Sequence, residues 1–269
     1  MPTPASGLLG ACKSGTVDEV SRQLDVEPGN RPPSVELLAA AMDGNNTPVL
    51  EYLIAKFKDD QPSTPWQADY KVIMQATERL EHFKLFWEAD PSVSTAYLGH
   101  TGNVPGFAVM GQNIPLLAFL LKTGVNPDDA QLMHRPAINW AVHSGYSEIV
   151  GLLLDHGAHV KESNALAIAQ EADKLDILKL LVEKGGMDIN VAQESASDDD
   201  QGDNDGDVTA NTGPVLHLAI AKGQAEMVRA LLQDLKADAT VKDGEGRTAL
   251  QRAQEQGNQE ILNLLARKA

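Results

Sequence analysis

Histidine and carboxylate side chains are the groups in this sequence that could carry out acid–base chemistry. His143 and Glu171 fall at equivalent positions of two successive helical segments, where about 10 Å, one helix-packing distance, would separate them. Histidine titrates near neutral pH, and a carboxylate can act with it as acid or base. A small molecule bound against Trp140 would meet both groups. One hypothesis is therefore an enzyme with an acid–base pair in a surface pocket.

Two patterns imitate metal sites. His156 and His159 form an H-x-x-H pair, but no cysteine ligand accompanies them. The segment 201–206 follows the first positions of a calcium-binding loop, yet Thr212 stands where that loop needs a glutamate. The sequence also lacks a glycine-rich phosphate loop and a G-x-S-x-G motif. We therefore expect neither a metal ion nor a cofactor.

Composition and charge exclude several classes of protein. The formal net charge is −16, so the chain repels phosphate backbones and we expect no nucleic-acid ligand. The single cysteine, Cys12, rules out a disulfide framework and favours a reducing compartment. No apolar run approaches the length of a membrane span. We expect a monomer in the cytoplasm, with the nucleus as the alternative.

The elements that would position the polar groups are clearest in residues 243–265. Thr248 stands where a helix N-cap is preferred, and Gly257 has the place of a left-handed C-cap. Leu250 and Ala253 between them are spaced as one apolar helix face. The inner face of a second short helix is marked by Ile261, Leu264 and Leu265. A unit of turn, helix, tight link and helix cannot bury its apolar face alone, so it needs stacked copies.

The register D-x-x-G-x-T-A-L…A…G…I-x-x-L-L of this stretch resembles the ankyrin repeat. The resemblance implies an all-α ankyrin-repeat solenoid of stacked helix-turn-helix units with short hairpin loops, forming a single domain over residues 1–269. Leu216 and Leu250 should then occupy matching places on adjacent helix pairs. We predict approximate repeats at 5–27, 33–57, 68–90, 101–126, 134–160, 163–190, 213–241 and 246–269.

Several repeats depart from the pattern. Gly15 and Gly44 are expected to mark the inter-helix turns of the first two, whereas Leu80 and Asp173 replace that glycine in the third and sixth. Cys12 should be a small buried hydrophobe. Residues 61–65 should form an irregular surface connection, and the hairpin between the fifth and sixth repeats must be truncated. An insert at 192–211 carries seven acidic residues and no Lys or Arg, which predicts a disordered loop that either steers basic partners or only increases solubility.

In the ankyrin family, the hairpin tips and the solvent face of each first helix line a concave groove. Trp140 is either a binding anchor there or a side chain packed between repeats. The register places the following candidate partner-binding residues in that groove: Met42, Asp43, Glu78, Arg79, Met110, Trp140, His143, Ser144, Tyr146, Glu171, Lys222 and Glu255.

Two functions follow from these observations. The resemblance and the missing catalytic motifs favour a protein-interaction scaffold without enzymatic activity, and the acidic surface favours a basic segment of another protein as its ligand. The alternative is an ankyrin-fold enzyme that binds a small molecule near Trp140 and His143.

Overall fold

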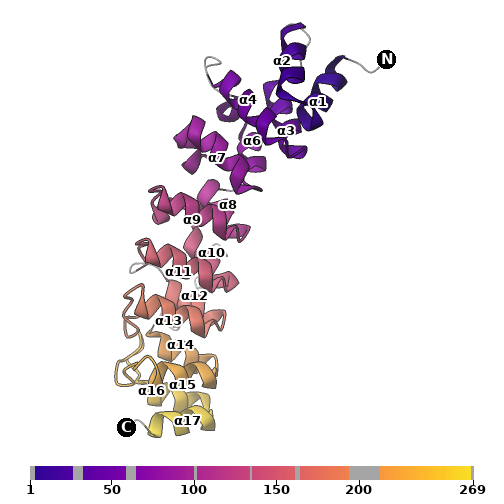
Figure 1. Ribbon diagram of the computed structural model, residues 1–269. Coiled ribbons are helices and arrows are strands. Elements are labelled where there is room, and N and C mark those ends of the chain that lie inside the picture. The colour runs from indigo at the N-terminus through magenta and orange to yellow at the C-terminus, as the bar shows by residue number, and fades with distance from the viewer. Residues whose placement is uncertain are drawn as a thin grey trace. The chain divides into compact units, whose positions relative to one another are not determined.

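The computed structural model describes residues 4–26, 33–58, 65–99, 102–133, 135–160, 164–193 and 213–267 (Figure 1). The chain divides into two compact units. The first contains Met1–Val125 and Asp129–Arg135, and the second contains Asn126–Asp128 and Pro136–Ala269. None of the described helices is long and apolar enough to cross a membrane.

The first unit is built from short helices connected in pairs. Its elements are α1 (Pro4–Ser14), α2 (Val17–Val26), α3 (Ser34–Asp43), α4 (Thr47–Phe57), α5 (Pro65–Ala68), α6 (Tyr70–Ala76), α7 (Leu80–Ala89), the 3₁₀ helix η1 (Pro91–Thr95), α8 (Val104–Met110) and α9 (Ile114–Lys122). Helices α1, α3 and α6 pack side by side, and α2 and α7 pack against α4. The segment after α9 contains η2 (Pro127–Asp129) and the two-residue strands β1 (Gln131–Leu132) and β2 (Arg135–Pro136), which pair with each other.

The second unit repeats one helix pair four times. Its elements are α10 (Ala137–Ser144), α11 (Ser147–Asp155), α12 (Ala165–Glu171), α13 (Leu175–Glu183), α14 (Val215–Ala221), α15 (Ala225–Gln233), α16 (Ala249–Gln256) and α17 (Gln259–Ala266). The first helices of the pairs form one layer, in which α12 packs on α10, α14 on α12 and α16 on α14. The second helices form the other layer (Figure 1). This mostly helical stack confirms the predicted all-α solenoid.

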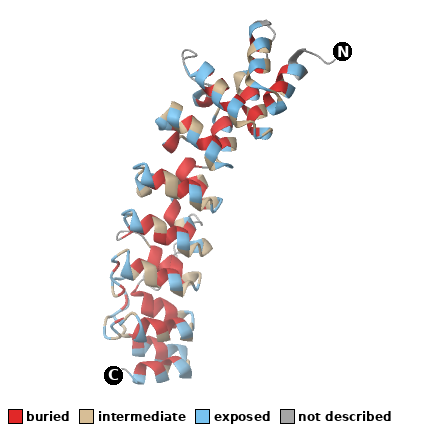
Figure 2. Ribbon diagram, in the orientation of Figure 1, coloured by how far each residue is buried: buried red, intermediate tan, exposed pale blue. Residues whose placement is uncertain are grey.

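Alanine allows the first helices to pack closely. In each first helix of the second unit, an alanine is buried four residues before the positive-φ residue of the inter-helix turn. Helices α3 and α8 of the first unit have a buried alanine at the same position. These side chains are almost completely buried: Ala41, Ala108, Ala141, Ala169, Ala219 and Ala253. Figure 2 shows buried residues along the facing sides of the helices in each unit. The core therefore depends on small residues at one position and on Leu, Ile and Val around it.

Leu216 and Leu250 are each the second residue of a first helix, and these helices, α14 and α16, pack together. The predicted match between the two positions is confirmed. Leu216 is 1% exposed because α16 covers it, whereas Leu250 is 41% exposed. The expectation that Leu250 lies on an inner apolar face is therefore wrong, since among the described residues no further helix pair packs against the far side of α16.

A left-handed residue marks most inter-helix turns. Gly145, Gly223 and Gly257 have positive φ, and Asp173 takes the same conformation at φ 55°, as predicted for the residue that replaces glycine. Thr248 and Gln251 form the predicted N-terminal cap of α16 as a capping box.

The turn of the second repeat lies one residue later than we predicted. Gly44 is right-handed at φ −77°, and Asn45 is the left-handed residue at φ 51°. Gly44 is required for a different reason, because a Cβ atom there would lie 1.8 Å from the carbonyl oxygen of Lys13 in α1. The close approach of α1, and not a positive φ, explains this glycine.

The link of the third repeat, Thr77–Arg79, is as long as the links of its neighbours, but its hydrogen bonds differ. The backbone N–H of Arg79 donates to the carbonyl of Ala76, three residues earlier, whereas the equivalent bond in α10 reaches five residues back, from Tyr146 to Ala141. No residue of this link has positive φ. The prediction that Leu80 replaces the turn glycine is therefore wrong, since Leu80 is the first residue of α7.

Two segments that we predicted to be irregular, 61–65 and 192–211, can be compared in part with the structure. Pro65, expected at the end of an irregular segment, begins α5, and the buried Trp66 packs edge-on against Phe86. The insert expected at 192–211 lies, except for Ala192 and Gln193, outside the described residues. Gln193 and Gly213 form a β-bridge, so these two residues lie next to each other. The division into eight repeats stays a prediction.

Candidate functional site

The predicted groove residues of the second unit gather at the C-terminal ends of the first helices. We call this set the first-helix edge; its members are His143, Ser144, Glu171, Lys222 and Glu255. His143, Lys222 and Glu255 are exposed, and the other two are half-buried. Because α10, α12, α14 and α16 share one layer, their ends lie along one side of the unit.

Ion pairs neutralise much of the charge on the first-helix edge. The Glu171 carboxylate lies 3.3 Å from the Lys222 ammonium of the next repeat, and Glu255 accepts from the Arg247 guanidinium at 3.0 Å. Ion pairs at the protein surface, such as these, add little stability. They do show that Glu171, predicted as the acid or base opposite His143, has a cationic partner instead.

Trp140 lies one helical turn before His143 on α10 and is 40% exposed. Ile168 and Leu218 hold the equivalent positions of α12 and α14, and both are buried. Trp140 is therefore partly packed and partly exposed, so it fits neither sequence interpretation fully: it is not a side chain buried between repeats, and it is not a fully exposed anchor. Tyr146 is half-buried at the N-cap of α11.

The two histidines of the H-x-x-H pair have separate partners. The Nδ1 atom of His156 lies 2.9 Å from the Leu152 carbonyl at the end of α11. His159 contacts one oxygen of the Asp128 carboxylate through Nδ1, and its backbone N–H donates to the other oxygen at 2.8 Å. Among the described residues, no group of three or more His, Cys, Asp or Glu side chains is arranged to hold a metal ion.

The first unit places its predicted groove residues less uniformly. Met42 is buried, so its assignment to an exposed groove is wrong; the turn begins one residue later, which rotates Met42 into the core and leaves Asp43 outside. Asp43 accepts a hydrogen bond from Gln75 at 2.8 Å. Glu78 and Arg79 are exposed in the α6–α7 link, and Met110 at the end of α8 is half-buried.

An exposed apolar stripe in the first unit was missed by sequence reasoning. We call it the hairpin stripe; its members are Tyr70, Met74, Tyr97 and Met133. Tyr97 is 56% exposed and Met133 is 59% exposed. The Tyr97 hydroxyl donates to the Gln131 side chain at 2.9 Å, and a Cβ at Gly99 would lie 3.2 Å from the Tyr70 ring. Tyr70 and Met74 are four residues apart on α6, so they share one helix face.

Side chains at the start of second helices tie neighbouring repeats together. The Asn46 amide donates to the Gly15 carbonyl at 2.9 Å, Asn113 to Thr77 at 2.8 Å, and Gln224 to Gln170 at 3.1 Å. These bonds satisfy carbonyls at the ends of the preceding repeat's first helix. They fix the spacing of the edges on which candidate binding residues stand.

Asp243 anchors the last hairpin. Its carboxylate accepts from the Arg247 backbone N–H at 2.9 Å and from the Arg252 guanidinium at 2.8 Å. Burial would raise the pKa of Asp243, but these hydrogen bonds and the Arg247 side chain outweigh it and lower the pKa to about 2. Burial lowers the pKa of His217, whose Nε2 lies 3.2 Å from the Arg247 carbonyl of the next repeat. This histidine is structural.

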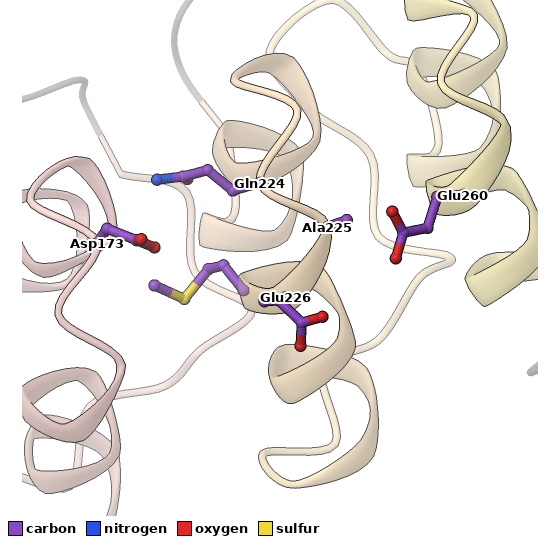
Figure 3. Close-up of a pocket in the computed structure, with 6 residues that line it drawn as sticks. Asp173, Gln224, Ala225, Glu226 and Glu260 are labelled. Carbon is purple, nitrogen blue, oxygen red and sulfur yellow. The ribbon is translucent and has the colours of Figure 1, made fainter.

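A shallow cleft of about 260 Å³ lies on the turn side of the second unit. We call it the turn cleft; it is lined by Asp173, Gln224, Ala225, Glu226, Met227 and Glu260. Figure 3 shows Asp173 on the α12–α13 turn on one side and Glu260 of α17 on the other, with the start of α15 between them. These residues belong to different elements from Trp140 and His143, around which the sequence suggested a pocket.

Comparison with known proteins identifies the family. A family model described as ankyrin repeats (3 copies) matches residues 106–193 and 197–269. The chain is an ankyrin repeat protein. The crystal structure of EF0377, an ankyrin repeat protein, is similar to this ankyrin repeat chain with a TM-score of 0.52 and 25% sequence identity, over 73% of this chain and 96% of that one. Ankyrin repeats are generally protein-interaction modules, and the family is typically non-enzymatic.

Proposed function

We propose that this ankyrin repeat protein is a non-catalytic scaffold that binds a partner protein along its first helices and hairpins. The observation that carries the proposal is the exposure of Trp140 on α10, where the equivalent residues of the next two repeats are buried. A rigid aromatic side chain gives a large contact area for little lost conformational entropy, which makes it an effective anchor. The first-helix edge supplies polar groups around it.

The hairpin stripe of the first unit supports the same proposal independently. Tyr and Met side chains are enriched at protein–protein interfaces, and the flexible Met side chain adapts to irregular partner surfaces. Tyr97 and Tyr70 are held by the Gln131 hydrogen bond and by packing on Gly99. Their position is therefore largely set before a partner binds.

Charge favours a basic segment as the ligand. The net charge of −16 raises the local concentration of cationic partners and speeds their association. Cys12, the one cysteine, is buried, which suits a monomer acting in a reducing compartment such as the cytoplasm.

Capture of partners with the full chain tests the proposal. We expect Trp140→Ala to weaken retention of the captured protein by roughly 30-fold, the effect of losing a hot-spot aromatic of about 2 kcal/mol. Leu250→Ala is the matched control, since Leu250 has nearly the same exposure at 41% but belongs to the far side of α16. Circular dichroism of each variant confirms that it is folded.

Two results would contradict the proposal. Equal retention by the wild type, Trp140→Ala and Tyr97→Ala would show that neither exposed aromatic surface binds the partner. Retention that does not change between low and high salt would remove the basic segment from the proposal, because contacts between exposed charges are screened by salt.

A further inference from the structure

Helix α7 buries a histidine where the other second helices from α4 onwards bury an apolar side chain. His82 is the third residue after Arg79, the N-cap of α7, and is 1% exposed. In α4, α9, α11, α13, α15 and α17 the third residue after the N-cap is apolar and at most 2% exposed; these residues are Val49, Leu116, Ile149, Ile177, Met227 and Ile261. The position therefore belongs to the core of each of these helix pairs, and α7 alone among these helices places a titratable group there.

The surroundings of His82 suit a neutral ring. Its Nε2 atom is buried and has no hydrogen-bond partner among the described residues. Helix α7 packs on α4, α6 and η1, and its Phe83 meets Phe119 of α9 edge-on. A charged imidazolium buried there would lose its hydration without gaining a partner in exchange. The packed helix pair therefore disfavours the protonated ring.

Two charged groups just before His82 in the chain act on its ring. Burial lowers the pKa of His82, the Arg79 charge lowers it further, and the Glu81 charge raises it. In an opened helix pair the ring is hydrated, so its pKa returns to about 6.5. The neutral ring therefore contributes stability in full above about pH 6.5, and this contribution is lost as pH falls toward the pKa of the folded state.

The elements packed on α7 do not supply a buried acid that could stabilise a proton on His82. The ionisable side chains of the neighbouring helices are Glu51, Tyr52 and Lys56 of α4, Tyr70 and Lys71 of α6, and Lys122 of α9. Glu51 is the one carboxylate in this described set, and it is exposed. Asp90, which joins α7 to η1, lies about two helical turns from His82 and already accepts hydrogen bonds from Trp66 and Gln67.

We propose that His82 makes the α6–α7 helix pair an acid-sensitive element, whose opening disrupts the hairpin stripe. A protonated His82 must reach water, and it can do so when α7 moves away from α4 and α6. Tyr70 and Met74 of the stripe stand on α6, so loosening of α7 removes the support of these two side chains. The effect on partner binding rests on the proposed function, whereas the opening itself does not.

Hydrogen–deuterium exchange of the full chain, measured by mass spectrometry on peptides covering 70–89, tests the opening without a partner. After correction for the intrinsic exchange rate, protection of these peptides should fall by up to about tenfold from pH 7.5 to pH 5.5, since opening takes up at most one proton at His82. His82→Leu, which introduces the residue that α9 has at this position, should abolish the fall. His217→Gln, which removes the buried histidine of the second unit, should leave it unchanged. Circular dichroism confirms that each variant is folded.

Retention of a captured partner at the same two pH values tests the effect on the hairpin stripe. The wild type should retain less partner at pH 5.5 than at pH 7.5, whereas His82→Leu should retain equal amounts. Equal protection of 70–89 at the two pH values, or an equal fall in His82→Leu, would overturn the acid-sensitive element. Opening of α6–α7 with unchanged retention would overturn its control of the stripe. Failure of the proposed function looks different, since retention at pH 7.5 would then survive both Trp140→Ala and Tyr97→Ala.

Discussion

Replacing Gly44 with alanine should separate α1 from α3. The added Cβ would lie 1.8 Å from the Lys13 carbonyl oxygen and 2.5 Å from its carbon, and backbone atoms cannot rotate away as a side chain can. The C-terminal end of α1 must therefore move by more than an ångström. Gly44 itself is right-handed, so alanine is not strained there by φ. We expect the overpacking to cost about 1–3 kcal/mol.

Gly10→Ala is the matched control for this change. Gly10 lies in the same interface helix, α1, but a Cβ there meets nothing within 4 Å. Alanine should stabilise the helix by about 0.5–1 kcal/mol relative to glycine. The two substitutions add the same methyl group, so their opposite effects isolate the contact with Lys13.

Cys12 provides the assay. Its side chain is fully buried in α1, and burial raises the pKa of its thiol to about 11, so a thiol reagent reacts only after local opening. We expect Gly44→Ala to speed labelling by roughly 10- to 100-fold, since each 1.4 kcal/mol corresponds to a factor of ten. Gly10→Ala should slow it. Labelling of Gly44→Ala at the wild-type rate would show that α1 does not pack on α3 as described.

Three further changes have defined outcomes. Asp243→Asn should cost about 2 kcal/mol at pH 7, the value of lowering its pKa to about 2, and the loss should disappear as pH falls from about 4 to 2 in urea unfolding experiments, since the wild type then loses the same charge. Burial lowers the pKa of His82 and of His217, so folding favours the neutral form of both; wild-type stability should fall as pH drops below about 6.5, and His217→Gln should weaken that dependence. Asp173→Gly should raise the unfolding free energy by about 1 kcal/mol by relieving the left-handed backbone, while thermal unfolding at an unchanged temperature would refute this.

Local signals predicted much of the second unit correctly. Thr248 and Gly257 act through their own backbone conformations and caps, so the ends of α16 could be assigned without knowing what packs on it. The alanine that precedes each turn can also be recognised from the spacing of the residues around it. Asp173 was correctly assigned as the turn residue because the flanking helices kept their spacing.

Features that depend on distant contacts could not be predicted in this way. Gly44 was expected to mark the inter-helix turn, but its contact with Lys13, far away in sequence, explains it, and the resulting shift of one residue misplaced Met42. The hairpin stripe likewise depends on the hydrogen bond between Tyr97 and Gln131, which are distant in sequence and are not part of a short sequence motif. The burial of Arg252 against Asp243 required knowledge of how the last hairpin folds back on α16.

A photo-crosslinking residue at position 143 tests the central claim, that the partner binds the first-helix side. Placed at the exposed His143, one turn after Trp140 on α10, it leaves the proposed anchor in place and should crosslink the captured partner, whereas the same residue at Glu183 on α13 should not. Crosslinking from position 183 with none from position 143 would contradict the scaffold surface proposed for this ankyrin repeat protein.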